Sequence, residues 1–147
     1  MEIEKLILHE NYNDSTSQND IALLKLKTPP NLSIYTPACL PEKNSSWTGE
    51  TASVYGWGDT KQGNGLPREI SPILKETTQR IIQDDECEEA YEKELDKQVC
   101  AKEKDQDSCS GDSGGPFTVE DEDEGKHFLV GVVNFGLENE CASVDSL

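Results

Sequence analysis

Residues 107–116 form a run of small and acidic residues closed by a proline, and they include the residue types that acyl transfer needs. Glycines at positions 111, 114 and 115 let the backbone take positive φ and turn its N–H groups toward an anion. Ser113 lies in the middle of this run. A serine hydroxyl on a tight turn, beside donors for a developing oxyanion, is typical of a nucleophile. A Gly/Ser turn that joins two strands is the alternative interpretation.

Asp20 is a second residue with candidate chemistry, because it stands directly before the mostly apolar segment 21–26. A carboxylate at the mouth of an apolar strand is expected to be desolvated and to need a hydrogen-bond partner. In acyl transfer by serine, such a carboxylate orients the base. Taken alone, Asp20 is better explained as an acid that starts the strand or caps a turn. Its occurrence together with the Ser113 run favours the catalytic interpretation.

The residues at 111–116, Gly-Asp-Ser-Gly-Gly-Pro, closely resemble the nucleophile loop of trypsin-like (chymotrypsin-family, S1) serine peptidases. The phrase Asn-Asp-Ile-Ala-Leu-Leu at 19–24 is similar to the family segment that carries the aspartate of the catalytic triad. The resemblance therefore implies that Ser113 is the nucleophile and that Asp20 orients the base. It also implies an oxyanion hole formed by the N–H groups of Gly111 and Ser113.

Substrate recognition is implied by the same resemblance. Asp107 lies six residues before Ser113, at the position that resembles the base of the primary specificity pocket. A carboxylate there with no internal cation would bind a substrate's guanidinium or ammonium group, which predicts cleavage after Arg or Lys. An ordinary exposed loop acid is the alternative for Asp107. Asn134, Phe135 and Gly136 occupy positions of the substrate-binding edge that the family usually fills with Ser, Trp and Gly.

The base itself is not identified among the two histidines. The family supplies it from a Thr-Ala-Ala-His-Cys-like segment before the aspartate, and no part of this sequence matches that segment. His9 precedes Asp20 in a strand-to-loop segment where the family often has a non-catalytic histidine, and His127 follows the nucleophile. The resemblance implies that the histidine segment and the activated N-terminus lie before Met1, and that the last strand and closing helix lie after Leu147. The chain alone is therefore expected to be inactive.

Asp112 matches the family acid that pairs with the new α-ammonium group after zymogen cleavage. A buried carboxylate without that partner is costly, so cleavage can switch the loop between two states.

Five cysteines in a chain of the secreted type leave one unpaired. The resemblance pairs Cys87 with Cys100 and Cys109 with Cys141, and it links Cys39 to a pro-segment or light chain. Five reduced cytosolic thiols are the alternative. No C-x-x-C or Cys/His cluster indicates a metal site, and no cofactor is expected.

A further disulfide of many family members is missing from both of its expected positions, Ala52 and Val119. Two small apolar residues can replace such a bridge with an ordinary core contact.

Short apolar or alternating segments separated by polar turns predict a mainly β protein. The expected strands are 2–9, 19–26, 51–58, 74–82, 98–101, 116–119 and 127–136. One helix is expected over 84–95, because Cys87, Tyr91 and Leu95 recur on one face. The resemblance implies an all-β fold of two antiparallel Greek-key β-barrels, truncated at both ends. Residues 1–45 would hold the rest of the N-terminal barrel and the connector, and residues 46–147 the C-terminal barrel without its last strand and helix.

The net charge of −17 argues against nucleic acid as a partner, because phosphate binding needs clustered Lys and Arg. The acidic runs 83–90 and 119–125 are expected to be solvated surface, or alternatively a rim that steers cationic substrates. No apolar run approaches the 18 or more residues of a membrane span, and no signal peptide begins the sequence. Glycosylation acceptor patterns at Asn13, Asn31 and Asn44, together with the cysteines, favour secretion to the extracellular space.

The sequence thus predicts a serine endopeptidase that cleaves after Arg or Lys, with the triad histidine outside this chain. Its partners would be protein or peptide substrates and serpin-type or other protease inhibitors. The alternative is a non-catalytic serine-protease homologue that binds or regulates a partner. A Thr-Ala-Ala-His-Cys-like segment upstream of Met1 would favour the enzyme. A segment of this kind in which the histidine is substituted would favour the non-catalytic homologue.

Overall fold

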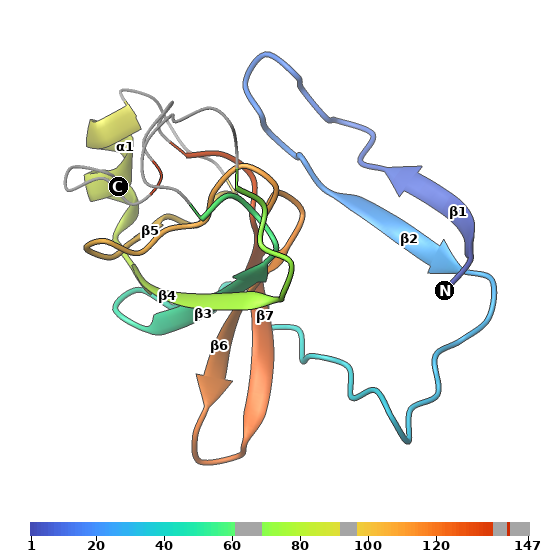
Figure 1. Ribbon diagram of the computed structural model, residues 1–147. Coiled ribbons are helices and arrows are strands. Elements are labelled where there is room, and N and C mark those ends of the chain that lie inside the picture. The colour runs from blue at the N-terminus through green and yellow to red at the C-terminus, as the bar shows by residue number, and fades with distance from the viewer. Residues whose placement is uncertain (61–68, 92–96, 137–140, 142–147) are drawn as a thin grey trace. The chain divides into compact units, whose positions relative to one another are not determined.

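The computed structural model describes residues 1–60, 69–91, 97–136 and 141. Within these residues seven β-strands and one short helix form, in two compact units, Met1–Ala38 and Cys39–Leu147 (Figure 1). This mainly β architecture confirms the fold class that the sequence predicts.

The first unit consists of one antiparallel pair, β1 (Ile3–Leu8) and β2 (Ala22–Leu26), in which Leu6 lies opposite Leu24. None of the residues 1–38, all of which the structure describes, is buried. Leu6 and Leu24 are each 55% exposed, so this unit has no core of its own. The pair depends instead on ladder hydrogen bonds and on exposed cross-strand ion pairs, which contribute little to stability.

The second unit contains a five-stranded antiparallel sheet in the order β5-β4-β3-β6-β7 (Figure 1). Its strands are β3 (Thr51–Gly56), β4 (Lys75–Ile81), β5 (Ala101–Lys102), β6 (Pro116–Asp121) and β7 (Lys126–Val132). The strands expected over 98–101 and 127–136 are therefore shorter or shifted. At β5 only two residues pair with β4, although Cys100 still accepts a hydrogen bond from the Ile82 N–H.

The core of this unit lies on one face of the sheet. It contains Ala52, Val54, Ile81, Phe117 and Val119, all at most 7% exposed. Ala52 is fully buried and Val119 is 4% exposed, so an apolar contact layer occupies the positions where many family members have a disulfide. Burial of these side chains, at about 25 cal/mol per Å² of apolar surface, holds β3 against β6 and so fixes the start of β6, which follows Ser113.

The helix α1 (Asp84–Tyr91) begins where the sequence predicts, and Leu95 lies outside the described residues. Three acidic residues in its first turn, at 84–86, complement the helix dipole. Cys87 is 1% exposed and packs with Ile82, Tyr91 and Cys100. The predicted apolar face is thus the face that holds α1 to the sheet.

The first unit ends at Ala38, and the barrel boundary at residue 45 stays a prediction. Cys39 belongs to the second unit because its backbone pairs with β7: its N–H donates to the His127 carbonyl, and its carbonyl accepts from the Leu129 N–H, each at 2.8 Å. Trp47 continues the attachment by packing on Phe128, with ring centroids 5.4 Å apart. The connector from Cys39 onward is therefore part of the second unit.

Candidate active site

Ser113 lies on a turn that is held by hydrogen bonds within the turn and to the rest of the second unit. Within the turn, the Asp112 N–H donates to the Cys109 carbonyl at 2.9 Å, and the Gly115 N–H donates to the Asp112 carbonyl at 2.8 Å. Beyond it, Val133 accepts a bond from the Gly114 N–H and donates one to the Gly115 carbonyl. This exchange joins the turn to the residue after β7. Ser113 itself is exposed, so its hydroxyl is accessible to a ligand.

The turn needs glycine at two positions because its backbone is left-handed there. Gly111 has φ of 107° and Gly114 has φ of 81°, values that side-chain-bearing residues adopt only with strain. Among the described residues, neither the Gly111 N–H nor the Ser113 N–H donates to any acceptor of the protein. Two unused donors beside an exposed hydroxyl can hydrogen-bond an oxyanion of a bound ligand.

The side chain of Asp112, the residue before Ser113, is held by two backbone N–H groups. Its Oδ1 accepts a hydrogen bond from the Gly58 N–H at 2.7 Å, and its Oδ2 accepts one from the Cys109 N–H at 2.9 Å. A β-carbon at either Gly56 or Gly58 would overlap this carboxylate. The Asp112 carboxylate thus requires glycine at both positions of the Gly-Trp-Gly segment. The sequence alone does not reveal this relationship. No cation of the described residues forms an ion pair with Asp112.

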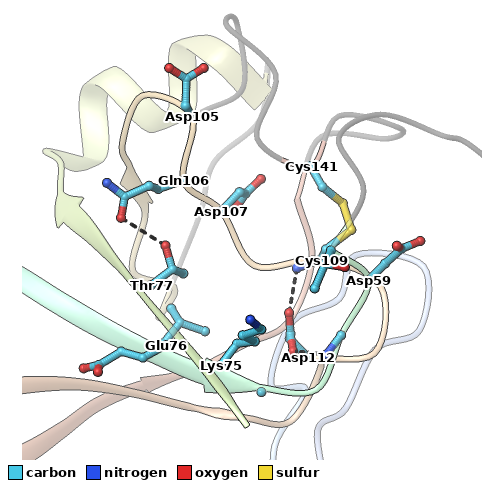
Figure 2. A pocket seen from close by; sticks show the side chains of 14 residues that line it. Asp59, Lys75, Glu76, Thr77, Asp105, Gln106, Asp107, Cys109, Asp112 and Cys141 are labelled. Carbon is cyan, nitrogen blue, oxygen red and sulfur yellow. Dashed lines mark hydrogen bonds between the residues drawn. A yellow bond between two sulfur atoms is a disulfide. The ribbon is translucent and has the colours of Figure 1, made fainter. Parts of the chain in front are cut away.

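A pocket of about 340 Å³ lies beside this turn, and Asp107, Asp112 and the disulfide between Cys109 and Cys141 line it (Figure 2). The pocket is negatively charged overall. Its acidic lining residues are Asp59, Glu76, Asp105, Asp107 and Asp112, and Lys75 is its one basic residue within the described part of the chain. A pocket of this charge favours a cationic group.

Asp107 is half-buried, and its Oδ1 accepts a hydrogen bond at 2.9 Å from Nε2 of Gln79, which lies on β4. The sequence predicts a carboxylate with an unmet charge at this position. The Gln79 amide satisfies one acceptor site but is neutral, so the unmet charge stays a prediction. Gln79 is only 7% exposed and is a site residue that sequence reasoning missed. Its polar side chain in an otherwise apolar stretch of the sheet is the signal that could have indicated it.

Tyr91 connects Asp107 with the segment after β7. Burial raises the pKa of the half-buried Tyr91 hydroxyl, and the negative charge of Asp107 raises it further. The ring of Tyr91 meets the ring of Phe135 edge to face, with centroids 5.5 Å apart. The sequence predicts Tyr91 only as part of a helix face, and its proximity to Asp107 follows from the tertiary structure.

Asn134, Phe135 and Gly136 follow β7, which ends at Val132 and not at 136 as expected. Asn134 is half-buried, whereas Phe135 is 39% exposed. In the described part of the chain, the backbone groups of Asn134 and Gly136 have no hydrogen-bond partner. This segment is therefore an open backbone edge that can pair with an extended peptide.

Asp20 and His9 belong to the unit Met1–Ala38, whereas Ser113 and His127 belong to the second unit, which is described separately. Asp20 is exposed within the first unit, and its desolvation in the intact protein stays a prediction. The His9 Nδ1 accepts a bond from the Asn11 N–H at 3.1 Å. His127 is exposed and lies on β7 opposite Glu120.

The cysteines form two disulfides, Cys87 with Cys100 and Cys109 with Cys141, which are the pairs that the family resemblance implies. The Cα atoms are 6.2 Å and 5.3 Å apart, respectively, within the usual range for disulfides. Cys39 has a free thiol and is half-buried.

The described part of the chain contains no helix that is both long and apolar enough to cross a membrane.

Comparison with known proteins identifies relatives along nearly the whole chain. The trypsin family model matches residues 1–146. The chain is 35% identical to serine protease filzig of Drosophila melanogaster, over 96% of this chain and 8% of that protein. It is 37% identical to mannan-binding lectin serine protease 1 of Mus musculus, over 99% of this chain and 20% of that protein. It is 36% identical to trypsin-1 of Astacus astacus, over 91% of this chain and 56% of that protein.

The chain thus spans between 8% and 56% of the length of these relatives. The match extends over both structural units and includes the turn of Ser113, the glycines that surround Asp112 and both disulfides. This chain belongs to the trypsin family of serine proteases.

Proposed function

We propose that the chain is part of a serine endopeptidase in which Ser113 is the nucleophile. The observation that carries the proposal is the turn itself: Ser113 is exposed, and the N–H groups of Gly111 and Ser113 in the same turn have no acceptor among the described residues. Ser113 Oγ attacks the peptide carbonyl and gives its proton to a base. The two N–H groups then stabilise the negative oxygen of the tetrahedral intermediate.

Peptide cleavage follows when the base donates the proton to the leaving amine, which leaves an ester on Ser113. Water, activated by the same base, then hydrolyses the ester and restores the serine. We expect a histidine outside these 147 residues to be the base, and Asp20 to orient it. The 147-residue chain alone is therefore expected to be inactive. Loss of the nucleophile or base in such a triad lowers kcat on the order of a million-fold.

We further propose that the enzyme cleaves after Arg or Lys. The acidic pocket beside the turn and the half-buried Asp107 carboxylate support this preference, because a guanidinium or ammonium group would supply the opposite charge. Gln79 would help to hold the Asp107 carboxylate in place for the substrate. The open backbone edge at Asn134 and Gly136 would pair with the substrate main chain, and Phe135 would flank it.

Asp112 is proposed as the activation switch. Its carboxylate accepts two backbone hydrogen bonds but has no cationic partner in the described residues. An α-ammonium group released by zymogen cleavage would supply that charge and favour one state of the turn.

Secretion is supported by the two disulfides, which persist in oxidising compartments. Cys39 is proposed to bridge to a pro-segment or light chain.

Hydrolysis of peptide substrates by the activated full-length protein, compared between wild type and Ser113→Ala, tests the proposal. We expect loss of essentially all activity in the variant. The second candidate function is a non-catalytic homologue that binds a partner, favoured by the fact that neither histidine of this sequence lies in a segment like the one that carries the family's catalytic base. Equal, background-level turnover by wild type and variant would favour this second function.

A further inference from the structure

Three Asn-x-Ser sequences, at 13–15, 31–33 and 44–46, fit the acceptor pattern for N-linked glycans. All three asparagines are exposed, so exposure does not distinguish one acceptor pattern from another. Their local hydrogen bonds differ, however. This difference is independent of the Ser113 site and of any catalytic interpretation.

Asn13 and Asn31 adopt the same local geometry. Asn13 Oδ1 accepts hydrogen bonds from the Ser15 N–H at 3.0 Å and from the Ser15 hydroxyl at 2.7 Å. Asn31 Oδ1 accepts the equivalent bonds from Ser33, at 3.0 Å and 2.7 Å. In both cases the hydroxyl of the third residue is turned onto the side-chain carbonyl of the asparagine. Neither Nδ2 donates to an acceptor among the described residues.

Asn44 differs in its backbone and in its side-chain contacts. It has a positive φ of 66°, and its side chain accepts no bond from Ser46. The Ser46 hydroxyl instead donates to the Thr48 hydroxyl at 3.3 Å and accepts a bond from the Thr48 N–H at 3.4 Å. Residues 44–46 therefore fit the acceptor pattern, but the Asn44 side chain accepts no hydrogen bond from the Ser46 hydroxyl.

This contact matters for the chemistry of transfer. Two donors on Oδ1 withdraw electron density from the amide and make Nδ2–H more acidic, while Nδ2 stays accessible. In the transfer, Nδ2 loses one proton and forms a bond to the anomeric carbon of a sugar. The bond between that carbon and the pyrophosphate of a polyprenyl-linked oligosaccharide breaks, and the pyrophosphate leaves with the electron pair. No oxidant or reductant takes part.

We propose that Asn13 and Asn31 carry N-linked glycans and that Asn44 does not. The contacts that prepare both asparagines lie within three consecutive residues, so they form without the tertiary structure and are available while the chain enters the secretory route. Asn13 lies in the connection between β1 and β2, and Asn31 follows the end of β2. Glycans there would flank the strand pair at its two ends and leave its apolar strand faces uncovered.

The test uses the full-length protein secreted from eukaryotic cells. Removal of N-glycans by a peptide N-glycosidase in ¹⁸O-labelled water converts each glycosylated Asn to a labelled Asp, which mass spectrometry locates. We expect the label at residues 13 and 31 and not at residue 44. An unlabelled Asn13 or Asn31, or labelling of Asn44 to the same extent, overturns the proposal.

Hydroxyl variants test the role of the local contact. Ser15→Ala and Ser33→Ala should each remove one glycan, whereas Ser15→Thr and Ser33→Thr, which keep the hydroxyl, should retain it. Ser46→Ala is the matched control and should not change the glycan number. The Ser113→Ala protein should carry the same two glycans as the wild type. Failure of the glycan proposal is thereby separated from failure of the proposed peptidase function.

Discussion

The Asp112 carboxylate accepts a hydrogen bond at 2.7 Å from the N–H of Gly58, which lies 54 residues earlier in the chain. Gly58 follows β3, and Asp112 lies in the turn before β6, so the paired strands β3 and β6 bring the two together. The side chain of Asp112, which precedes Ser113, is thus hydrogen-bonded to the loop that contains Gly58. The conformation of the nucleophile turn depends on the space beside Gly58, which a β-carbon would fill.

Gly58→Ala in the full-length protein tests this dependence. The new β-carbon would overlap the Asp112 carboxylate and displace it, so we expect the free energy of unfolding to fall by about 1–3 kcal/mol. Activity should fall with it, because the Ser113 turn moves. Gly131→Ala, where the added atom meets only the Phe117 side chain at ordinary contact distance, is the control and should have a smaller effect. Equal stability of Gly58→Ala and wild type would contradict the described packing.

Asp107→Ser should change the cleavage preference. We expect kcat/KM for Arg and Lys substrates to fall at least about a hundred-fold relative to matched Phe and Leu substrates, because the charged partner is lost. Glu103→Ser removes an exposed acid of the same loop that does not line the pocket, and it should leave the preference unchanged. A wild type that prefers Phe or Leu, or an Arg preference untouched in Asp107→Ser, would show that Asp107 does not set specificity.

The pKa of Tyr91 gives a test of the link between α1 and Asp107. Because the pKa is raised in the folded state, the folded protein retains a proton that the unfolded protein releases above about pH 10. The stability contribution is therefore fully present below pH 10 and is lost as the pH rises through the folded pKa. Tyr91→Phe should remove this part of the pH dependence. Asp107→Asn should lower the Tyr91 pKa in a titration of tyrosinate absorbance, and an unchanged pKa would exclude the charge effect.

The disulfides are tested by peptide mapping of the natural full-length protein without reduction. We expect Cys87 linked to Cys100, Cys109 linked to Cys141, and Cys39 linked to a cysteine outside these residues. A bridge from Cys39 to any of the other four would overturn this arrangement.

The sequence predicts those features that depend on neighbouring residues. The turn at Ser113 follows from its glycines, and the start of α1 follows from its acidic first turn and from Cys87. The early end of β7 is not predicted, because the apolar pattern continues to Phe135 while the backbone of Val133 pairs with the nucleophile turn instead.

Contacts between segments that are distant in the chain also cannot be predicted from the sequence. The bond from Gln79 to Asp107 joins residues 28 positions apart, and only the register of β4 brings Gln79 beneath the loop that carries Asp107. The desolvation of Asp20 stays a prediction for a similar reason. Desolvation requires a covering layer, and a local pattern does not indicate which distant segment supplies that layer.

Ser113 is proposed to be an activated nucleophile in the full-length protein. Reaction of the activated protein with a fluorophosphonate, followed by peptide mapping, tests this claim. We predict a single phosphonylated serine, Ser113, formed at a rate typical of active serine peptidases, and no labelling of Ser113→Ala. A folded, proteolytically processed wild type that stays unlabelled, or one labelled equally in the Ser113→Ala variant, would contradict the claim.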